Sequence, residues 1–165
     1  MIGAAQYTTQ VSGSTIFVSP LDTLPLRNIP VIAPKFSFDE MIDASAVAMS
    51  IRTLAAQLEL SGTLAVFVPW RGSATFARLD AFCRGVIGGL TGVLSADAPI
   101  VLAGDGDVGG LIGIHLREEL KVANPVVSVD GLELKDFDYI DVGTMLPTSG
   151  AVPVVIKSLV FPGGA

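Results

Sequence analysis

The amino-acid sequence contains a single cysteine, Cys83, and a single histidine, His115, among 165 residues. One thiol excludes a disulfide within the chain and the thiolate clusters of most structural zinc sites. Such a sequence suits a reducing cytoplasm. Basic residues are also scarce, because ten Lys and Arg stand against sixteen Asp and Glu, for a net charge of −6. They are scattered along the chain, and we therefore expect no nucleic-acid partner.

The sequence also lacks long apolar runs, although half of its residues are hydrophobic. No run approaches the roughly 18 to 20 apolar residues that cross a bilayer. Residues 1–6 contain neither the charged region nor the apolar region of a signal peptide. These absences predict a cytoplasmic protein that is neither exported nor embedded in a membrane.

Glycine and aliphatic residues, in contrast, are abundant. Eighteen glycines and an aromatic content of 7% indicate a core of Val, Ile, Leu and Ala with closely packed backbones. The length suits one domain over residues 1–165. Apolar runs at 64–68, 99–103 and 126–129 predict buried strands separated by helices, and residues 137–161 predict a β-rich C-terminal segment. We therefore expect an α/β domain with three layers, in which helices flank a mostly parallel sheet.

The first helix has a clear start signal in the sequence. Ser37 to Glu40 form a capping-box pattern, in which a serine hydroxyl and a glutamate carboxylate satisfy backbone N–H groups reciprocally. Apolar residues follow at helical spacing, namely Val47, Ile51, Leu54 and Leu58. We expect this helix to begin at Ser37 and to end at Ser61-Gly62.

Glycine and proline set limits on two further elements. A second helix is expected from Ser73, with Phe76 on its buried face. Glycines at 85, 88 and 89 lower its propensity by up to about 1 kcal/mol each relative to alanine, so tight packing must compensate. Pro30 donates no backbone hydrogen bond, which restricts a strand at 29–33 to an edge or terminal position.

The most distinctive motif is Gly104-Asp105-Gly106-Asp107-Val108-Gly109, which fits G-x-G-x-x-G between a predicted strand and a predicted helix. Asp130 stands where a dinucleotide fold places its ribose-binding carboxylate. One interpretation is therefore a small Rossmann-like dinucleotide-binding oxidoreductase. Against it, Asp105 and Asp107 place two negative charges where a pyrophosphate would bind. The glycines also suit a tight turn that binds no ligand, which is the interpretation we favour.

A second candidate region is Trp70-Arg71-Gly72, which follows a predicted central strand at the edge where α/β sheets bind ligands. Together with the motif at 104–109, which we call the Gly104 loop, Trp70 and Arg71 could hold a planar or anionic group. The chain would then be a plain ligand-binding module. The alternative is an exposed loop with a packed tryptophan. Asp97 could join Asp105 and Asp107 around a hard cation such as magnesium, although a solvated acidic loop is the simpler interpretation.

Catalysis by this chain alone has little support in its sequence. His115 and Cys83 both fall on predicted helices, where packing is the expected role of each. The sequence contains no G-x-S-x-G, HExxH or CxxC motif and no P-loop lysine. We therefore expect no enzyme activity from the chain by itself, and we assign no catalytic residue and no metal ligand.

Motifs near both ends of the chain are more informative than its middle. They are Ile2-Gly3-Ala4-Ala5, Ser12-Gly13-Ser14-Thr15-Ile16, the stretch from Leu24 to Val31, the stretch from Asp138 to Gly143, and the stretch from Val152 to Phe161. In this order they resemble the C-terminal region of ethanolamine ammonia-lyase reactivating factors. The resemblance extends over nearly the whole chain.

The resemblance implies part of an ATP-dependent, chaperone-like factor. Such a factor restores adenosylcobalamin-dependent ethanolamine ammonia-lyase by helping to exchange damaged cobalamin for intact cofactor. The implied partners are the lyase and an N-terminal ATPase core, whose phosphate-binding loops are absent from this sequence. ATP and magnesium are accordingly expected for a longer parent protein and no cofactor for this chain. We expect a C-terminal fragment that resides in the cytoplasm or associates with a bacterial microcompartment.

Polar residues within the end motifs are the candidates for contact with the ATPase core or the lyase. They are Arg27 and Asn28 in the first part of the chain, and Asp141 and Lys157 in the last. Residues 138–143 alternate polar and apolar side chains up to a glycine, as the arm of a half-buried hairpin does. The alternative is that these motifs only hold the fold together.

Overall fold

A computed structural model describes residues 4–12 and 16–160. The strands are β1 (Ala4–Ser12), β2 (Phe17–Ser19), β3 (Leu26–Ile32), β4 (Ala65–Val68), β5 (Ile100–Gly104), β6 (Val126–Val129), β7 (Tyr139–Val142) and β8 (Val152–Val160). The helices are α1 (Ala44–Gln57), α2 (Phe76–Leu90) and α3 (Gly109–Ile114), with a 3-10 turn η1 (Leu21–Thr23) and a π-helical segment η2 (His115–Glu119). Motif positions 1–3, 13–15 and 161 lie outside the described residues.

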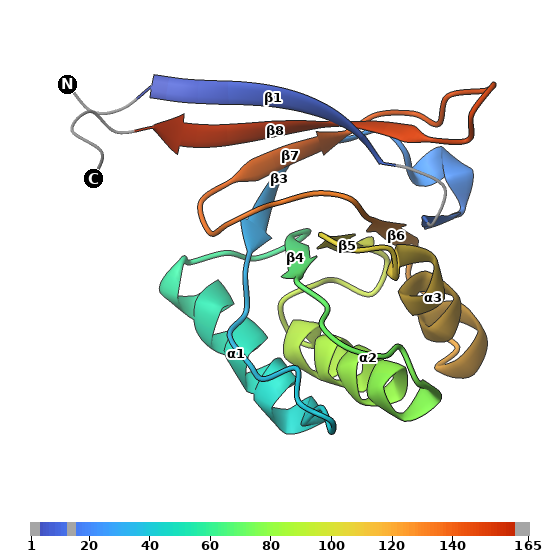
Figure 1. Ribbon diagram of the computed structural model, residues 1–165. Coiled ribbons are helices and arrows are strands. Elements are labelled where there is room, and N and C mark those ends of the chain that lie inside the picture. Colours follow the sequence, from blue (N-terminus) through green and yellow to red (C-terminus); the bar gives the residue numbers. More distant parts are fainter. Residues whose placement is uncertain (1–3, 13–15, 161–165) are drawn as a thin grey trace.

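The described strands form one mixed, curled sheet in the order β1-β8-β7-β3-β4-β5-β6-β2. Strands β3 to β6 run parallel, and β2 pairs antiparallel with β6 at one edge. Beyond β3, the strands β7, β8 and β1 continue the sheet antiparallel. The helices α1, α2 and α3 all lie on one side of the parallel strands (Figure 1). The mixed α/β composition is confirmed, whereas the predicted three-layer, mostly parallel sheet is wrong.

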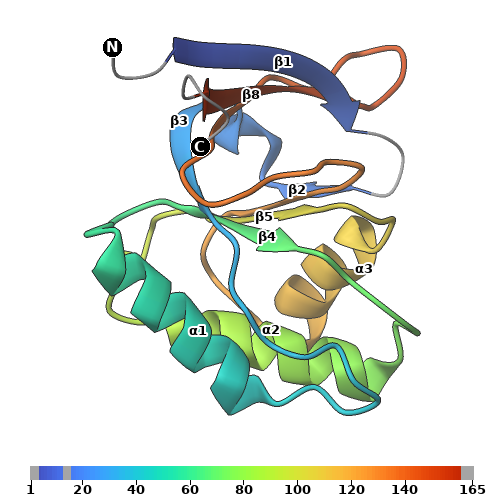
Figure 2. The ribbon, with the colours of Figure 1, turned by 60° about the vertical axis from the view of Figure 1, so that its left-hand side comes forward.

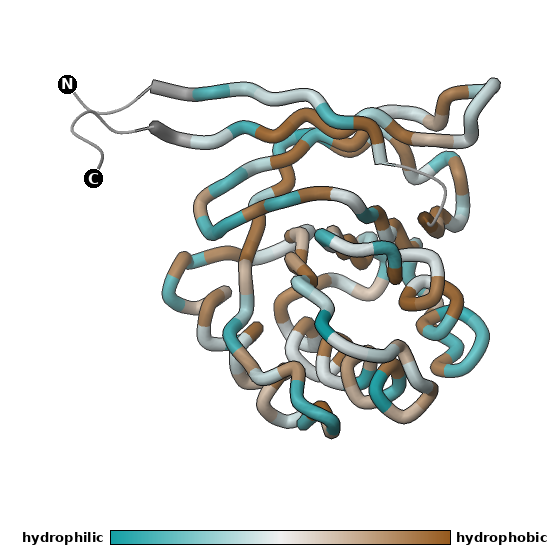
Figure 3. The backbone as a smooth tube through the Cα atoms, in the orientation of Figure 1, coloured by the Kyte–Doolittle hydropathy of each residue, from teal (hydrophilic) through white to brown (hydrophobic). Residues whose placement is uncertain are grey.

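The sheet itself covers the face of the parallel strands that the helices leave free (Figure 2). One core lies between the helices and the sheet and includes Val66 and Leu102. A second core lies on the opposite face, where Phe67 and Val101 pack with apolar residues of β7 and β8 such as Ile140 and Val154. Figure 3 shows the apolar residues that run through these central strands. Because the antiparallel strands supply this second apolar layer, a second layer of helices is not needed.

Helix α1 begins later than its sequence pattern predicted. Its N-cap is Asp43, whose carboxylate accepts hydrogen bonds from the backbone N–H groups two and three positions further on. The helix start predicted at Ser37 is wrong, because Phe36 and Phe38 on either side of it contribute to an aromatic cluster. Their ring centroids lie 5.8 and 6.2 Å from that of Phe82 on α2. Packing of the two rings therefore holds this segment outside the helix.

Glycines allow α2 to pack against α1 at short distance. A Cβ atom at Gly85 would lie 2.6 Å from Cβ of Val47, and one at Gly89 would lie 2.7 Å from Cβ of Ile51. Both of these α1 side chains are fully buried. The tight packing that the glycines required is confirmed, and it allows α2 to continue to Leu90.

The two later helices differ from prediction at their ends. Helix α2 begins three residues after Ser73, with Thr75 as its N-cap. Phe76, which was expected on the buried face, is 61% exposed, and its ring contacts that of His115 at a centroid distance of 5.0 Å. Helix α3 has only six residues before the chain widens into η2. None of the helices in the described part of the chain is long and apolar enough to cross a membrane.

Strand β3 lies inside the sheet, so the edge position predicted from Pro30 is wrong. Leu26, Ile29 and Pro30 pair with β7, whereas Val31 and Ile32 pair with β4. Pro30 thus lies where the pairing changes from one neighbour to the other. Because Pro30 lies where the ladder with β7 ends and the ladder with β4 begins, its missing N–H interrupts neither of them. An internal strand can therefore contain this proline.

The buried strands and the C-terminal hairpin agree with the sequence pattern. All residues of β4, β5 and β6 are buried, as their continuous apolar runs predicted. Strands β7 and β8 form an antiparallel pair, and Ile140 and Val142 are buried while Tyr139 is exposed. The half-buried hairpin arm predicted at residues 138–143 is therefore confirmed.

Candidate functional site

The four polar residues selected in the end motifs, Arg27, Asn28, Asp141 and Lys157, lie together on the outer face of the antiparallel strands. The Lys157 ammonium donates hydrogen bonds to Oδ1 of Asn28 (2.7 Å) and to Oδ1 of Asp141 (3.0 Å). Its nitrogen lies 2.9 Å from the second carboxylate oxygen. The backbone N–H of Asn28 also donates to Oδ1 of Asp141, at 2.7 Å. We refer to these four residues as the Asp141 cluster.

An irregularity in β3 brings Asn28 to this position. The register with β7 shifts between Leu26 and Ile29, and Asn28 adopts a φ of 54°. Asparagine tolerates this left-handed region better than most residues. The shift gives Asp141 a backbone donor from β3 in addition to the ammonium from β8. The charged residues are thereby held in place by three neighbouring strands.

The electrostatic balance of the Asp141 cluster keeps its carboxylate ionised. Burial raises the pKa of Asp141, but the hydrogen bonds from Asn28 and Lys157 and the charges of Lys157 and Arg27 outweigh it. The pKa of Asp141 therefore lies below its ordinary value of 3.8. The side chains of Asp141 and Lys157 are 18% and 21% exposed, and Arg27 is exposed.

The structure also brings Arg71 to the Gly104 loop, because the preceding strands β4 and β5 are neighbours. The guanidinium of Arg71 lies 3.1 Å from Oδ2 of Asp105 and donates to Oδ1 at 3.3 Å. Trp70 is directed differently. It is 7% exposed, donates its indole N–H to the carbonyl of Gly72 and packs edge-on against Phe82.

Within the Gly104 loop, backbone groups bond to the chain itself. The N–H of Asp105 donates to the carbonyl of Val68, and the carbonyls of Gly104 and Gly106 accept from the segment at 131–132. A Cβ atom at Gly104 would lie 3.2 Å from that Val68 oxygen, so the close approach of two backbones favours glycine here. Asp107 is exposed and Gly109 begins α3. The Asp105 amide already has an acceptor, and the carboxylates of Asp105 and Asp107 oppose an anionic phosphate at this loop.

The two other carboxylates considered with this loop lie elsewhere. Asp130 is 3% exposed beside the end of β1, where its N–H donates to the Ser12 hydroxyl at 2.8 Å. Asp97 precedes β5, whereas Asp105 and Asp107 follow it, so the length of the strand separates them. The three-carboxylate cation site is therefore wrong. No group of three or more His, Cys, Asp or Glu side chains that could hold a metal occurs among the residues with described positions.

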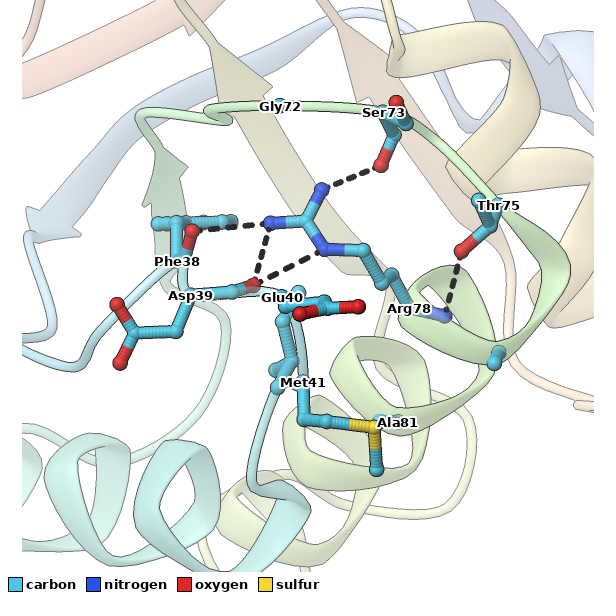
Figure 4. Close-up of a pocket in the computed structure, with 11 residues that line it drawn as sticks. Phe38, Asp39, Glu40, Met41, Gly72, Ser73, Thr75, Arg78 and Ala81 are labelled. Carbon is cyan, nitrogen blue, oxygen red and sulfur yellow. Dashed lines mark hydrogen bonds between the residues drawn. The ribbon is translucent and has the colours of Figure 1, made fainter.

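A hollow that the sequence analysis missed lies between residues 38–42 and the first turns of α2. Its volume is about 510 Å³, and Arg78 forms part of its wall. Figure 4 shows the Arg78 guanidinium held between two segments of backbone. It donates to the carbonyls of Phe38 (3.1 Å) and Asp39 (3.0 Å) on one side.

On its other side the same guanidinium donates to the carbonyl of Arg71, at 2.8 Å, and to that of Ser73. Arg78 is 7% exposed and its guanidinium carbon lies 5.2 Å from the centre of the Trp70 ring. The hydrogen bonds of the guanidinium go to backbone oxygens of two loops, so the side chain ties these loops together. The available sequence signal was a basic residue one turn before Phe82, on the helix face that also carries Gly85.

Two further residues are buried, Cys83 within α2 and His115 at the start of η2. The His115 imidazole is hydrogen-bonded to Oδ1 of Asp80 at 2.8 Å, and Arg84 donates to Oδ2 at 2.7 Å. Hydrogen bonds from Arg84 and then His115 hold the pKa of Asp80 below its ordinary value. Burial raises the pKa of the Cys83 thiol to about 12. Cys83 is therefore a neutral packing residue near neutral pH.

Comparison with known proteins assigns the chain to a family. The family described as "Ethanolamine utilisation protein EutA" matches residues 1–162. Two relatives named "Ethanolamine ammonia-lyase reactivase EutA", from Salmonella typhimurium and Escherichia coli, are each 32% identical over 165 residues. The alignments cover 98% of this chain and 33% of each relative, so the chain spans about a third of their length. No solved structure matches the chain.

The family match agrees with the resemblance that the end motifs indicated. It covers nearly the whole chain, including both blocks of motifs and the four residues of the Asp141 cluster. The chain therefore belongs to the family of ethanolamine utilisation protein EutA.

Proposed function

We propose that this chain is the C-terminal part of a reactivating factor for ethanolamine ammonia-lyase and that it acts as an interaction module. The observation that carries the proposal is the family match over residues 1–162, together with two relatives that are named as reactivases of this lyase. The neutral buried thiol of Cys83 and the hydrogen bond between buried His115 and Asp80 suit packing roles for Cys83 and His115, which supports binding as the role of the chain. In this proposal the chain does not itself deaminate ethanolamine.

We propose the outer face of β1, β8 and β7 as the contact surface. Tyr7 and Tyr139 both lie opposite Lys157 in the strand register, one on each side. These tyrosines are 65% and 42% exposed, and the Lys157 ammonium lies 5.8 Å from the ring centroid of Tyr7. Aromatic residues and arginine are enriched in protein interfaces, and Arg27 borders this row. The surface thus combines apolar area with fixed charges.

In the same proposal, ATP and magnesium act outside the described residues of this chain. The resemblance implies an ATPase core in the longer reactivases, and the chain spans only about a third of the relatives' length. Asp105 and Asp107 oppose an anionic phosphate at the Gly104 loop, so the proposal assigns no nucleotide step to it. The domain would then respond to the ATPase core and contact the lyase in the cytoplasm.

Binding of the chain to immobilised ethanolamine ammonia-lyase tests this function. We expect retention of the wild-type chain, and stronger retention when the lyase carries damaged cobalamin than when it carries intact adenosylcobalamin. The variant Arg27→Glu reverses an exposed charge and should weaken binding about tenfold, which corresponds to about 1.4 kcal/mol. Lys35→Glu reverses an exposed charge after the end of β3 and serves as the matched control, with unchanged binding expected.

Different results of this binding experiment test the interaction role of the chain and the proposed contact surface separately. Absence of retention for the wild-type chain on either form of the lyase would contradict the interaction module. If the wild-type chain binds and Arg27→Glu binds equally well, the Asp141 cluster is not the contact surface. Equal losses for Arg27→Glu and Lys35→Glu would indicate a general charge effect.

A further inference from the structure

Helix α3 and the π-helical segment η2 that follows it lie at one end of the layer of helices. Figures 1 and 2 both show α2 between α3 and α1, so α3 has a helical neighbour on one side only. Residues of this segment such as Ile112 and Leu116 are buried in the core between the helices and the sheet. Leu111 and Ile114, in contrast, are each 49% exposed, and Glu118 of η2 is exposed as well. Intervals of three and four residues place these exposed residues on one face of a helix.

Phe76 at the start of α2 adds an aromatic side chain to this surface. It is 61% exposed, and its ring contacts that of His115 at a centroid distance of 5.0 Å. His115 directly follows Ile114, is 4% exposed and is hydrogen-bonded to Asp80, one turn after Phe76 on α2. The buried imidazole therefore supports the Phe76 ring at the junction of the two helices. We refer to Phe76, Leu111 and Ile114 as the α3 patch, and such a group of large exposed apolar side chains indicates a contact surface.

The basic residues near the α3 patch are already engaged within the chain. Arg71 lies 3.1 Å from Asp105, and Arg84 lies 2.7 Å from Asp80. Arg117 of η2 donates hydrogen bonds to two backbone carbonyl groups. The positive charges of this region are therefore either balanced by a carboxylate or held against the main chain.

Two carboxylates at the ends of the same surface have no such partner. Asp107 lies two residues before α3, and Glu118 lies about one turn after Ile114. Both are exposed, and neither forms a hydrogen bond or an ion pair with another residue that the structure describes. They are eleven positions apart, which corresponds to about 16 Å at the rise of a helix. The α3 patch thus lies between two uncompensated negative charges.

We propose that the α3 patch docks an amphipathic helix of a partner protein, in which lysine or arginine residues flank the apolar side chains. The apolar face of that helix packs on Leu111, Ile114 and Phe76, because residues three and four positions apart on a helix form such an anchoring row. Its basic residues pair with Asp107 and Glu118, which have no counter-ion within the described chain. A second copy of this chain does not fit, because its own α3 face would bring like charges together.

This docking surface is separate from the contact surface proposed above. The α3 patch lies on the helices, whereas the Asp141 cluster lies on the antiparallel strands, on the other side of the parallel strands (Figure 1). A chain with both surfaces can bind two partners at the same time. The docking of a basic helix does not depend on the proposed function, because it requires only α2, α3 and η2.

Fluorescence anisotropy of two labelled peptides with the full 165-residue chain tests the docking. Each peptide has about 20 residues, mostly alanine and glutamine, which favour a helix. The lysine peptide carries Lys, Leu, Leu and Lys at the intervals found in Asp107, Leu111, Ile114 and Glu118. The glutamate peptide carries Glu in place of both lysines. We expect micromolar binding of the lysine peptide, and binding at least about tenfold weaker for the glutamate peptide.

Substitutions in the chain locate the bound peptide. Leu111→Ser removes a half-exposed apolar side chain and should weaken binding of the lysine peptide about tenfold. Leu21→Ser on η1 is the matched control with unchanged binding expected, because Leu21 is 57% exposed. Glu118→Lys should also weaken binding of the lysine peptide. Glu133→Lys reverses an exposed charge after β6 and should leave that binding nearly unchanged.

An exchange of charges completes the test and controls for folding. Asp107→Lys combined with Glu118→Lys should reverse the preference, so that the chain binds the glutamate peptide more tightly than the lysine peptide. Only a folded variant can gain this affinity. A wild-type chain that binds neither peptide or both equally, or a double variant that still prefers the lysine peptide, would overturn the proposal. Equal losses in Leu111→Ser and Leu21→Ser, or in Glu118→Lys and Glu133→Lys, would overturn the α3 patch as the docking site.

Discussion

The two regions of the sheet on either side of β3 differ in what covers them. Strands β4, β5 and β6 are buried on both faces, by helices on one side and by the curled sheet on the other. Strands β7 and β8 bury one face and present polar and aromatic residues on the other, and β1 is largely exposed. One continuous sheet thus contains a region that is buried on both faces and a region that has one exposed face. The parallel region is enclosed on both faces, and the antiparallel region carries the surface that we propose for contact with a partner.

The largest loss in the free energy of unfolding is expected at the contact between α1 and α2. Gly85→Leu would insert a side chain where even a Cβ atom lies 2.6 Å from Val47. We expect a loss of about 3 kcal/mol or more in the free energy of unfolding, because an overpacked contact must separate the two helices. Urea denaturation followed by circular dichroism measures this loss.

A neighbouring glycine provides the matched control for that substitution. A Cβ atom at Gly88 would lie 3.5 Å from Cβ of Ala48, which is ordinary contact. Gly88→Ala should therefore stabilise the chain by up to about 1 kcal/mol through helix propensity. A similar loss of stability in Gly85→Leu and Gly88→Ala would show that the close packing of α1 on α2 is not responsible.

The next largest effect is expected at Arg78. Arg78→Met retains much of the apolar stem but leaves the carbonyls of Phe38, Asp39 and Arg71 without this donor. Such a loss of charge-assisted hydrogen bonds should lower the free energy of unfolding by about 2 to 3 kcal/mol. Arg84→Met is the control, because that side chain is 62% exposed and its ion pair is expected to contribute less than about 1 kcal/mol. Equal unfolding midpoints for the two variants would contradict the tie between the loops.

The smallest effect is expected in the antiparallel region, at the Asp141 cluster. Because the pKa of Asp141 is lower in the folded chain than its ordinary 3.8, its ionised form stabilises the fold. This contribution is present above that value and is lost as the pH falls through the folded pKa. Asp141→Asn should therefore cost less than about 1 kcal/mol at pH 7, since both partners are partly exposed. The difference from the wild-type chain should shrink as the pH falls below 3.8.

Urea titrations at several pH values measure the pH dependence of this difference. The informative quantity is the difference in free energy of unfolding between the wild-type chain and Asp141→Asn. A difference that stays constant down to pH 3 would contradict the role of the charge. A loss as large as that of Arg78→Met would mean that the antiparallel region contributes to stability as much as the parallel one does.

Several local features could be predicted because their causes lie within a few residues. The apolar runs at 64–68 and 126–129 could only be buried strands, and the alternation at 138–143 indicated one buried face. The glycines in α2 predicted a close neighbour, although they did not identify Val47 as that neighbour. The end motifs indicated the family, and they contain all four residues of the Asp141 cluster.

Other features depended on partners far away in the sequence. The start signal at Ser37 was strong locally, but the rings of Phe36 and Phe38 pack with Phe82 on α2 instead. Pro30 was expected at an edge because nothing nearby shows that β3 changes partner in the middle. The role of Arg78 could not be predicted, because its acceptors near residue 39 belong to a different loop.

The sequence by itself determined the family, the buried parallel strands, the C-terminal hairpin and the polar residues that line its outer face. These follow from the period of apolar residues and from short motifs, which act locally along the chain. Only the tertiary structure decided that the sheet curls over its own second face, that β3 is internal and that β1 comes last in the order of the described strands. Each of these depends on which distant segments pack together, and a curled sheet that covers itself forms only when all of its strands are in place.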